Sequence, residues 1–273
     1  MDEWSLAIAN TLLGNERNAA ALEWAIGGGA LRFEDDVDIA LSGAEVEGTL
    51  DGTPVRAGSR IFARAGQILR IERLLARRFL YVAVSGGVNS PPVLGSRSTY
   101  LPAGIGGIEG RRLKKGDTIL TRKLGNEKTT AGIVKEEGPD YGSDVIRVVA
   151  YADEKAFAEF AGASYAVSAA SDRMGYRLEC SQSLHALGAS ITSEPVCAGA
   201  IQLPPNGQPI VLMADSPTVG GYRIIGTVIS CDLPILAQCM PGRILRFAGV
   251  SVEIAQKELR RRENVLNGRS VTA

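Results

Sequence analysis

The sequence is poor in the residues that several common kinds of active site require. It contains one histidine, His185, and no CxxC pair. A lone histidine excludes a metal site built on clustered histidines and argues against a Ser–His hydrolase. We therefore expect no metal site, and chemistry carried by carboxylates, arginines, lysines, hydroxyls or backbone amides. The four cysteines have no zinc-like spacing and are expected to be reduced and buried: Cys180, Cys197, Cys231 and Cys239.

An excess of charge and long apolar runs are also missing. Thirty Lys and Arg residues balance thirty Asp and Glu residues, which argues against a nucleic-acid scaffold or a polybasic membrane binder. No apolar run approaches the ~20 residues of a transmembrane helix. The opening MDEWSLAIANTLLGN lacks the basic region of a signal peptide. We expect a soluble, cytoplasmic protein with no nucleic-acid or membrane partner. The absence of GxxxxGK[ST] excludes a P-loop of the usual kind.

Glycine is abundant, at 32 of 273 residues, while aromatic residues make up only 5%. Glycines between short apolar runs indicate many tight turns and a β-rich fold. The strand candidates recur at roughly ten-residue spacing, which favours barrels or sandwiches over βαβ units. Helices are expected from the cap Asp2 to Gly14, from the cap Asp153 through Phe160, and over 252–266. In the first half we expect strands at 30–34, 37–45, 46–55, 60–72 and 79–88, and a further strand within 114–123.

Two segments interrupt this pattern. Residues 86–117 form a long Gly-, Pro- and Ser-rich loop that either presents backbone amides and Arg97 to an anion or simply covers the first group of strands. Residues 122–143 are polar and turn-rich, as at a domain boundary. We therefore expect one β-barrel subdomain at 1–125 and a second at 126–273.

The second half holds most of the candidate site residues. Asp215 ends the apolar strand PIVLMAD, where it either takes part in proton transfer or caps the turn that follows. Gln202 lies inside an apolar strand and must find a partner or face solvent. Asn206-Gly207 predicts a hairpin turn. If SDRMGYRL is a strand, Arg173 and Arg177 lie on one face and could clamp a carboxylate or phosphate; exposed arginines on a sheet edge are the alternative.

Four motif groups carry a resemblance to a known family. They are YVAVSGGV…PPVLGSRSTY…GIGG…GRRLKKGD, SDRMGYRL, SEPV…GAIQLPPNGQPIVLMAD…T.GGY and DLP…AQ…PG…RF. Together they resemble the allophanate hydrolase subunit 2 family, which includes one component of bacterial 5-oxoprolinase and half of the urea carboxylase carboxyltransferase domain. The resemblance covers nearly the whole chain. It implies a mainly β fold with a few helices, arranged as two cyclophilin-like β-barrel subdomains.

The resemblance also implies a function and a site. The implied enzyme is one component of an ATP-dependent 5-oxoprolinase that opens 5-oxoproline to glutamate, working with A-like and B-like partner subunits on a small amide substrate. Asp215 and Glu194 are the implied acid/base or amide-orienting groups. Six further residues are the implied substrate-binding groups: Arg97, Arg173, Arg177, Gln202, Thr218 and Tyr222. Two alternatives remain, namely carboxyl transfer from carboxybiotin to urea or another amide, and a regulator that binds a histidine-kinase inhibitor without catalysis.

The chain departs from the family pattern in three places. Pro217 and Val219 replace polar residues that usually flank Thr218, so one substrate contact is expected to differ. Cys180 replaces a glycine, which indicates a local packing change. Met1 and Asp2 match the end of the family's opening segment, so the first barrel is expected to lack its amino-terminal strands.

Overall fold

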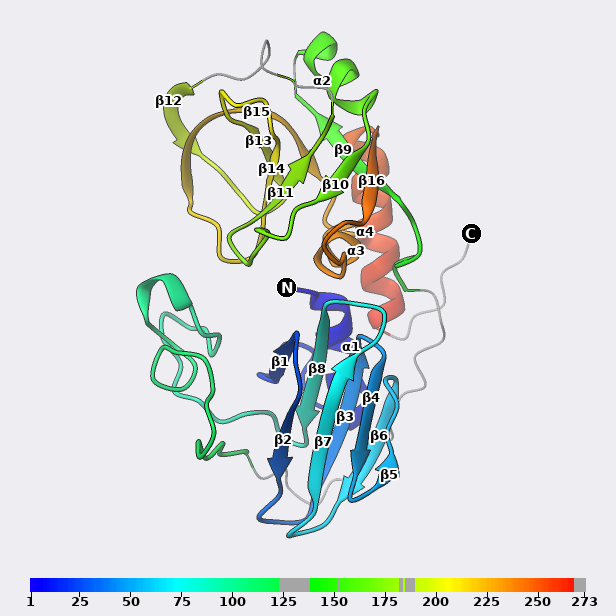
Figure 1. Ribbon diagram of the computed structural model, residues 1–273, viewed down its shortest axis with the longest axis vertical. Helices are drawn as coiled ribbons and strands as arrows, with labels where there is room; N and C mark the ends of the chain where they lie inside the picture. Colours follow the sequence, from blue (N-terminus) through cyan, green and yellow to red (C-terminus); the bar gives the residue numbers. More distant parts are fainter. Residues whose placement is uncertain (123–137, 152, 182–183, 185–189, 268–273) are drawn as a thin grey trace. The chain divides into compact units, whose positions relative to one another are not determined.

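The fold is that of a computed structural model, which describes residues 1–122, 138–151, 153–181, 184 and 190–267. The chain divides into two compact units. Glu3–Glu136 form the amino-terminal unit, and Met1–Asp2 together with Glu137–Ala273 form the barrel unit. Figure 1 shows the helices and strands of each unit with their labels. His185 and the predicted boundary between residues 125 and 126 lie outside the described residues.

In its described part, the amino-terminal unit is built from two four-stranded antiparallel sheets. The sheet order is β1-β8-β3-β6 in one sheet and β2-β7-β4-β5 in the other. The strands are β1 (Leu22–Ala25), β2 (Gly29–Arg32), β3 (Val37–Gly43), β4 (Val46–Leu50), β5 (Thr53–Pro54), β6 (Ser59–Ala63), β7 (Ile68–Leu74) and β8 (Phe79–Val84). These strands confirm the segments expected between residues 30 and 88, except that turns at 51–52 and 65–66 divide 46–55 and 60–72 into two strands each.

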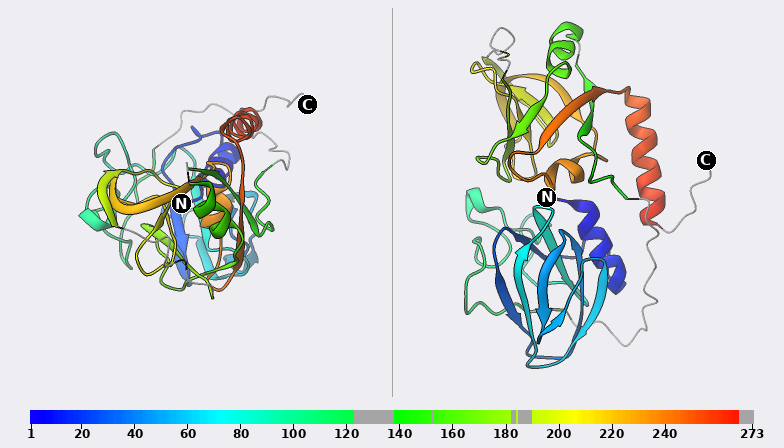
Figure 2. Two further views of the ribbon diagram at one scale, coloured as in Figure 1. Left: turned by 90° about the horizontal axis from the view of Figure 1, so that it is seen from above. Right: turned by 45° about the vertical axis from the view of Figure 1, so that its right-hand side comes forward.

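The core of this unit follows from the alternation of its strands. Inward side chains of both sheets, among them Ile39, Leu41, Leu69, Ile71 and Leu80, form one fully buried cluster. Because neighbouring residues of a strand point to opposite faces, the residues between these lie on the outer faces. Helix α1 (Glu3–Leu13) contacts β3, β8 and β6, and Figure 2 shows it lying lengthwise beside the strands.

The long loop after β8 is ordered by local turns. It contains the short 3₁₀ helix η1 (Leu101–Ala103) and an isolated bridge between Val88 and Thr121. The strand expected within 114–123 is wrong over its described residues 114–122, which hold a turn and that single bridge, because no neighbouring strand extends the bridge into a ladder. Gly86 and Gly107 have positive φ angles and lie close to Arg122 and Thr99, so the loop packs against itself through its glycines.

The barrel unit contains a closed ring of strands. The ring order is β15-β13-β14-β11-β10-β16-β9, and β9 pairs again with β15 to close it. The strands are β9 (Val145–Ala150), β10 (Tyr165–Val167), β11 (Gly175–Glu179), β12 (Ser190–Pro195), β13 (Ala200–Leu203), β14 (Ile210–Leu212), β15 (Val219–Val228) and β16 (Ile244–Gly249). Strand β12 lies outside the ring and pairs only with the first part of β15. The predicted turn at Asn206-Gly207 joins β13 to β14, so that prediction is confirmed.

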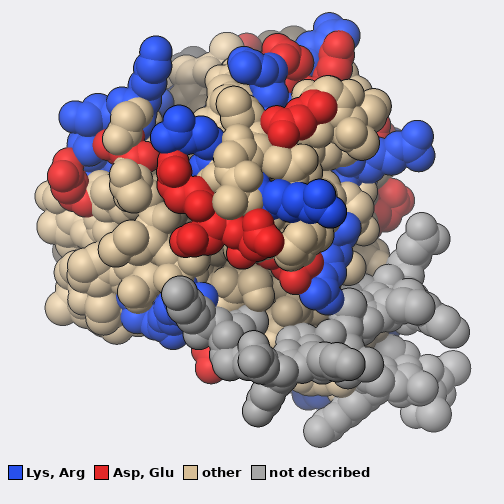
Figure 3. Space-filling view, turned by 90° about the horizontal axis from the view of Figure 1, so that it is seen from below, with Lys and Arg blue, Asp and Glu red and all other residues tan. Residues whose placement is uncertain are grey.

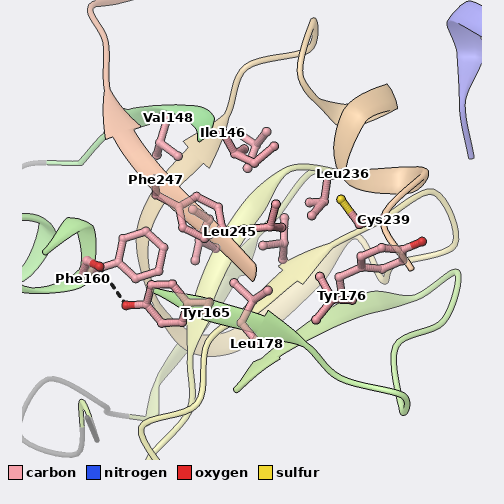
Figure 4. Packing of buried hydrophobic residues seen from close by; sticks show 14 of the residues in the cluster. Ile146, Val148, Phe160, Tyr165, Tyr176, Leu178, Leu236, Cys239, Leu245 and Phe247 are labelled. Carbon is pink, nitrogen blue, oxygen red and sulfur yellow. Dashed lines mark hydrogen bonds between the residues drawn. The ribbon is translucent and has the colours of Figure 1, made fainter. Parts of the chain in front are cut away.

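Aromatic side chains fill one end of the barrel core. Phe160 lies 4.8 Å from Phe247 and 5.0 Å from Tyr165 between ring centroids, and Figure 4 shows the three rings together. The buried Tyr165 hydroxyl donates to the Phe160 carbonyl at 2.8 Å, and the Tyr176 hydroxyl donates to the Ala237 carbonyl at 2.6 Å. Both phenols therefore keep a hydrogen bond inside an apolar core, as burial requires.

In the described part of the barrel unit, three helices accompany the barrel: α2 (Glu154–Ala161), α3 (Leu233–Ala237) and α4 (Val252–Leu266). Asp153 caps α2 by accepting from the Ala156 amide, which confirms the cap expected there. The span of α4 is also confirmed. Within the described residues, no helix combines the length and the apolar character needed to cross a bilayer.

The mainly β fold with a few helices is thus confirmed, but the expectation for the cysteines is wrong in part. Cys231 and Cys239 are buried, whereas Cys180 is half-buried and Cys197 is exposed. Cys197 lies in the turn before β13, where the chain runs over the surface and small residues need not pack inward.

On the face drawn in Figure 3, acidic side chains gather near the middle with basic ones around them, so neither sign covers that face.

Candidate functional site

Arg173 and Asp215 lie together at one end of the barrel, although 42 positions separate them. Arg173 lies in the turn before β11, and Asp215 lies just beyond β14. These two strands are antiparallel neighbours, with Gly175 opposite Leu212. Their ladder continues past the strand ends, because the Asp215 amide donates to the Arg173 carbonyl at 2.8 Å. The pairing of the two strands therefore sets the position of both side chains.

The two side chains form a two-pronged ion pair. Arg173 donates from Nε to Oδ2 of Asp215 at 2.8 Å and from Nη2 to Oδ1 at 2.9 Å. Asp215 is only 6% exposed. Both carboxylate oxygens are thus directed at one guanidinium, which is the geometry that a planar fork favours. This arrangement replaces the turn cap as the structural role of Asp215, and it orients Arg173.

Arg177 and Gln202 lie on the outer face of the barrel sheet. Arg177 of β11 is opposite Ile210 of β14, and Ile210 is opposite Gln202 of β13. Directly paired residues project to the same face. The neighbouring row, which contains Tyr176 and Ile201, belongs to the buried core, so the row of Arg177 and Gln202 faces outward. Arg173 lies outside the strand, so the two arginines do not form the pair on one strand face that a continuous strand would give.

Gln202 is nevertheless buried, at 6% exposure. Its Nε2 atom is shut off from solvent and has no hydrogen-bond partner among the described residues. The carboxamide takes the space that a side chain on Gly220 would need, since a Cβ built there would overlap Nε2. An amide donor closed away without an acceptor is costly in a folded protein, and such a group calls for an explanation.

Glu194 belongs to β12 and Tyr222 to β15. Thr218 lies at the end of the loop between β14 and β15. Glu194 is opposite Gly220, and the Thr218 carbonyl accepts from the Val196 amide at 2.9 Å. Tyr222 is 40% exposed, and Glu194 and Thr218 are exposed too. We call the paired strands β12 and 219–222 of β15 the arm. Glu194 lies close to Gln202, because its pairing partner Gly220 lies against the Gln202 carboxamide, whereas Tyr222 pairs with Ser190 further along the arm.

Arg97 belongs to the amino-terminal unit. It is half-buried in the loop after β8, where its carbonyl accepts from the Ser90 hydroxyl at 3.2 Å. The Ser98 amide donates to the Ser96 hydroxyl at 3.1 Å. The loop thus satisfies part of its own polar groups, and the anion-binding role predicted for it stays a prediction.

Two buried acids of the barrel unit were not among the predicted site residues. Asp232 is 1% exposed and binds Arg147 through both oxygens, with Nη2 to Oδ1 at 2.7 Å. Hydrogen bonds to Asp232 raise the pKa of Arg147 above its already high ordinary value. Asp2 is fully buried and accepts from the Tyr141 hydroxyl and from Nε2 of Gln238. Asp232 belongs to the DLP motif and Gln238 to the AQ motif. Their place in these family motifs is the sequence feature that could have pointed to them.

The described side chains offer no obvious metal centre. Nowhere in the ranges that the structure describes do three His, Cys, Asp or Glu side chains gather closely enough to ligate an ion. What the barrel unit does offer is a set of hydrogen-bond donors and carboxylates for a small polar ligand. These are the oriented Arg173, the exposed Arg177, the buried amide of Gln202 and the exposed Glu194.

The fold and these motifs define a carboxyltransferase domain. The chain belongs to this family, because the family model described as carboxyltransferase domain, subdomain A and B, matches residues 1–249. It is 39% identical over 277 residues to the C subunit of 5-oxoprolinase from Haemophilus influenzae, across 98% of this chain and 87% of that protein. It is 38% identical over 267 residues to the Escherichia coli protein of the same name, across 94% of this chain and 84% of that protein.

A solved structure supports the architecture. The Kluyveromyces lactis urea carboxylase matches all of this chain with a TM-score of 0.85 at 23% identity. The chain spans 27% of that solved chain. At this identity the likeness establishes the fold. The family resemblance predicted from the motifs is confirmed.

Proposed function

We propose that the chain is the C-type component of an ATP-dependent 5-oxoprolinase, an enzyme that opens 5-oxo-L-proline to L-glutamate. One observation carries the proposal: 39% identity across 87% of a protein named as the C subunit of 5-oxoprolinase. The enzyme works as a complex with A-like and B-like partner subunits in the cytoplasm, and ATP is a co-substrate of the complex. The named relatives of this chain are themselves subunits, which supports the need for partners.

The chemistry of lactam opening fits the residues of the barrel unit. A lactam carbonyl is a poor electrophile, so the reaction needs groups that stabilise negative charge on its oxygen and groups that move protons. Arg173 is held in place by Asp215 and serves as the oriented cation. Glu194 is exposed on β12 and serves as the proton-transfer group. Asp215 acts through Arg173, because both of its oxygens already accept from that guanidinium.

The decisive experiment is reconstitution. The chain is co-expressed with its candidate A-like and B-like subunits, and glutamate release from 5-oxoproline is measured with and without ATP. We expect release that requires ATP and all three chains. Arg173→Lys should lower kcat, because a lysine cannot bind a carboxylate in two places, while the matched change Arg246→Lys at the exposed Arg246–Asp144 pair should not. A complete complex that releases no glutamate would contradict the proposal.

A second function is favoured by one observation, the description of the matching family model as a carboxyltransferase domain. Under this alternative the chain transfers a carboxyl group from carboxybiotin to urea or another amide. Its partners would then include a biotin carboxylase and a biotin carrier. Incorporation of labelled bicarbonate into urea by such an assembly, with no glutamate release from 5-oxoproline, would support this function over the first.

A further inference from the structure

The buried amide of Gln202 carries hydrogen-bond donors that the fold does not use. Its neighbours in β13, Ile201 and Leu203, point into the barrel core, whereas Gln202 points to the outer face. A glutamine on an outer face would normally reach water. Here Nε2 is sealed and meets no acceptor among the described residues, because the arm lies over it. The two N–H groups of this amide are therefore directed toward the underside of the arm.

The arm must bend to reach this position. Gln202 is paired with Ile224 of β15, and Gly220 lies four residues further along. In a straight strand that separation is about 13 Å, yet Gly220 lies against the Gln202 carboxamide. Strand β15 therefore curls back over the outer face of the barrel. Figure 1 shows β15 as a long curved ribbon with β12 at its outer side.

Two further groups share this face. Glu194 is directly opposite Gly220 on the arm, so its side chain leaves the arm on the same side as the Gly220 position. Arg177 lies two strands away from Gln202, about 10 Å between Cα atoms, and projects from the same outer face. Its guanidinium is exposed and no described residue accepts a hydrogen bond from it. One neutral donor, one carboxylate and one cation thus lie on the facing sides of the arm and the barrel, and the Val196 side chain also lies against the Gly220 position.

We propose that this face binds an amide-bearing carboxylic acid. Gln202 Nε2 donates to the amide carbonyl oxygen, the Glu194 carboxylate accepts from the amide N–H, and the Arg177 guanidinium pairs with the ligand carboxylate. The inference rests on the proposed function, since 5-oxoproline is the ligand of this class that the proposed enzyme takes. The three contacts differ in kind, so each group of the ligand is recognised by a side chain that suits it alone.

Entry of the ligand requires the arm to move. In the observed conformation, in which the arm lies over Gln202, the carboxamide of Gln202 fills the space beside Gly220 and no acceptor can approach Nε2. The unmet hydrogen bonds of Gln202 make the closed state less favourable than a state in which a ligand carbonyl satisfies them. The arm accordingly opens to admit the ligand and closes on it, with Gly220 providing the room for the carboxamide.

The first test measures binding to the co-purified complex without ATP, using three probes. These are 5-oxoproline, 2-pyrrolidone, which lacks the carboxylate, and cyclopentanecarboxylate, which lacks the amide. Arg177→Gln should weaken the binding of 5-oxoproline by at least about tenfold and leave the affinity for 2-pyrrolidone unchanged. Gln202→Leu should weaken the binding of the two amides, 5-oxoproline and 2-pyrrolidone, and leave the affinity for cyclopentanecarboxylate unchanged. The control Arg246→Gln should change none of the three. Unchanged 5-oxoproline affinity in Arg177→Gln or in Gln202→Leu would overturn the assignment, as would a complex that binds no probe.

The second test follows the arm itself by amide hydrogen exchange. Gly220→Ala places a Cβ against Nε2 of Gln202 and should raise exchange in residues 190–195 and 219–222. Gly221→Ala is the matched control, because a Cβ there meets its nearest atoms, in Ile191 and Ser193, at 3.5 Å. The double change Gly220→Ala with Gln202→Ala removes the overlap with the carboxamide, leaving only a close contact with Cγ1 of Val196 at 3.2 Å, and should restore most of the protection. Equal exchange in the two single variants would contradict the arrangement under the arm.

The two proposals fail in distinguishable ways. If the complex turns over 5-oxoproline but neither Arg177→Gln nor Gln202→Leu affects its binding, this assignment is wrong and the proposed function stands. If the probes bind as described but no assembly releases glutamate, the site stands and the proposed function is wrong.

Discussion

Arg173 holds both carboxylate oxygens of Asp215 through its Nε and Nη2 atoms, at 2.8 and 2.9 Å. The backbone repeats this link, since the Asp215 amide donates to the Arg173 carbonyl. An acid that looks like a free catalyst at the end of an apolar strand is therefore half of an ion pair. The pair joins the ends of two neighbouring strands. It therefore both stabilises the barrel and orients the Arg173 side chain.

Asp215→Asn should lower the free energy of unfolding by about 2 kcal/mol, because it replaces charge-assisted hydrogen bonds at a buried site. Urea unfolding of the chain measures this loss. The matched change Asp144→Asn removes an ion pair whose side chains are more than half exposed, and should cost less than about 1 kcal/mol. Equal losses in the two variants would show that burial of the Arg173–Asp215 pair adds nothing.

Gly86→Ala should destabilise the amino-terminal unit more than Gly52→Ala does. Both glycines have positive φ angles and both changes strain the backbone, which costs about 1 kcal/mol. Only at Gly86 would the added Cβ overlap a carbonyl, that of Arg122, which should add roughly 1–3 kcal/mol. Denaturant midpoints of the two variants give the comparison. A smaller loss for Gly86→Ala would mean that the loop after β8 moves aside freely.

Asp117 should titrate at unusually low pH. Hydrogen bonds from Arg111, followed by one from the Lys114 amide, lower the pKa of Asp117 from 3.8 to about 2. The contacts of the charged form should stabilise the loop fully above pH 3.8 and be lost as the pH falls through about 2. Carboxyl chemical shifts across this range give the measurement. Arg111→Gln should raise the pKa of Asp117, whereas the neighbouring change Arg112→Gln should leave it where it is.

The four thiols should react in a fixed order. Cys197 is exposed and should be alkylated first, with the half-buried Cys180 next. Burial raises the pKa of the Cys231 thiol, and Cys239 is buried and donates to the Ile235 carbonyl, so these two should react last. Mass spectrometry after timed treatment with iodoacetamide resolves the order, and Cys197→Ser should remove the fastest phase. Early labelling of Cys239 in the native protein would contradict this packing.

Much of the secondary structure could be predicted from local sequence. Alternation of apolar residues and turn glycines located the strands between residues 30 and 88, and Asp153 and the 252–266 pattern located two helices. These signals act over a few residues, so they survive without knowledge of the fold. The segment 114–123 misled the prediction because a short apolar run after a Gly-Asp turn looks like a strand, although no neighbouring strand among the described residues forms a ladder with it.

The site could be predicted only as a set of residue types. The motifs pointed to Gln202, Glu194, Arg177 and Asp215, but not to how these side chains meet. The link between Arg173 and Asp215 depends on the pairing of β11 with β14, and the burial of Gln202 depends on the bend in β15. Neither relationship leaves a trace in nearby sequence, since the contacting residues are far apart along the chain.

The sequence by itself determined the β-rich class, the turn at Asn206-Gly207, the helix cap at Asp153 and the family, because these follow from patterns within short segments. Only the tertiary structure decided which polar groups are engaged and which are left for a ligand. That distinction rests on burial and on distances between distant segments. It moved Asp215 from a free acid to a partner of Arg173, and it left the amide of Gln202 without an acceptor under the arm.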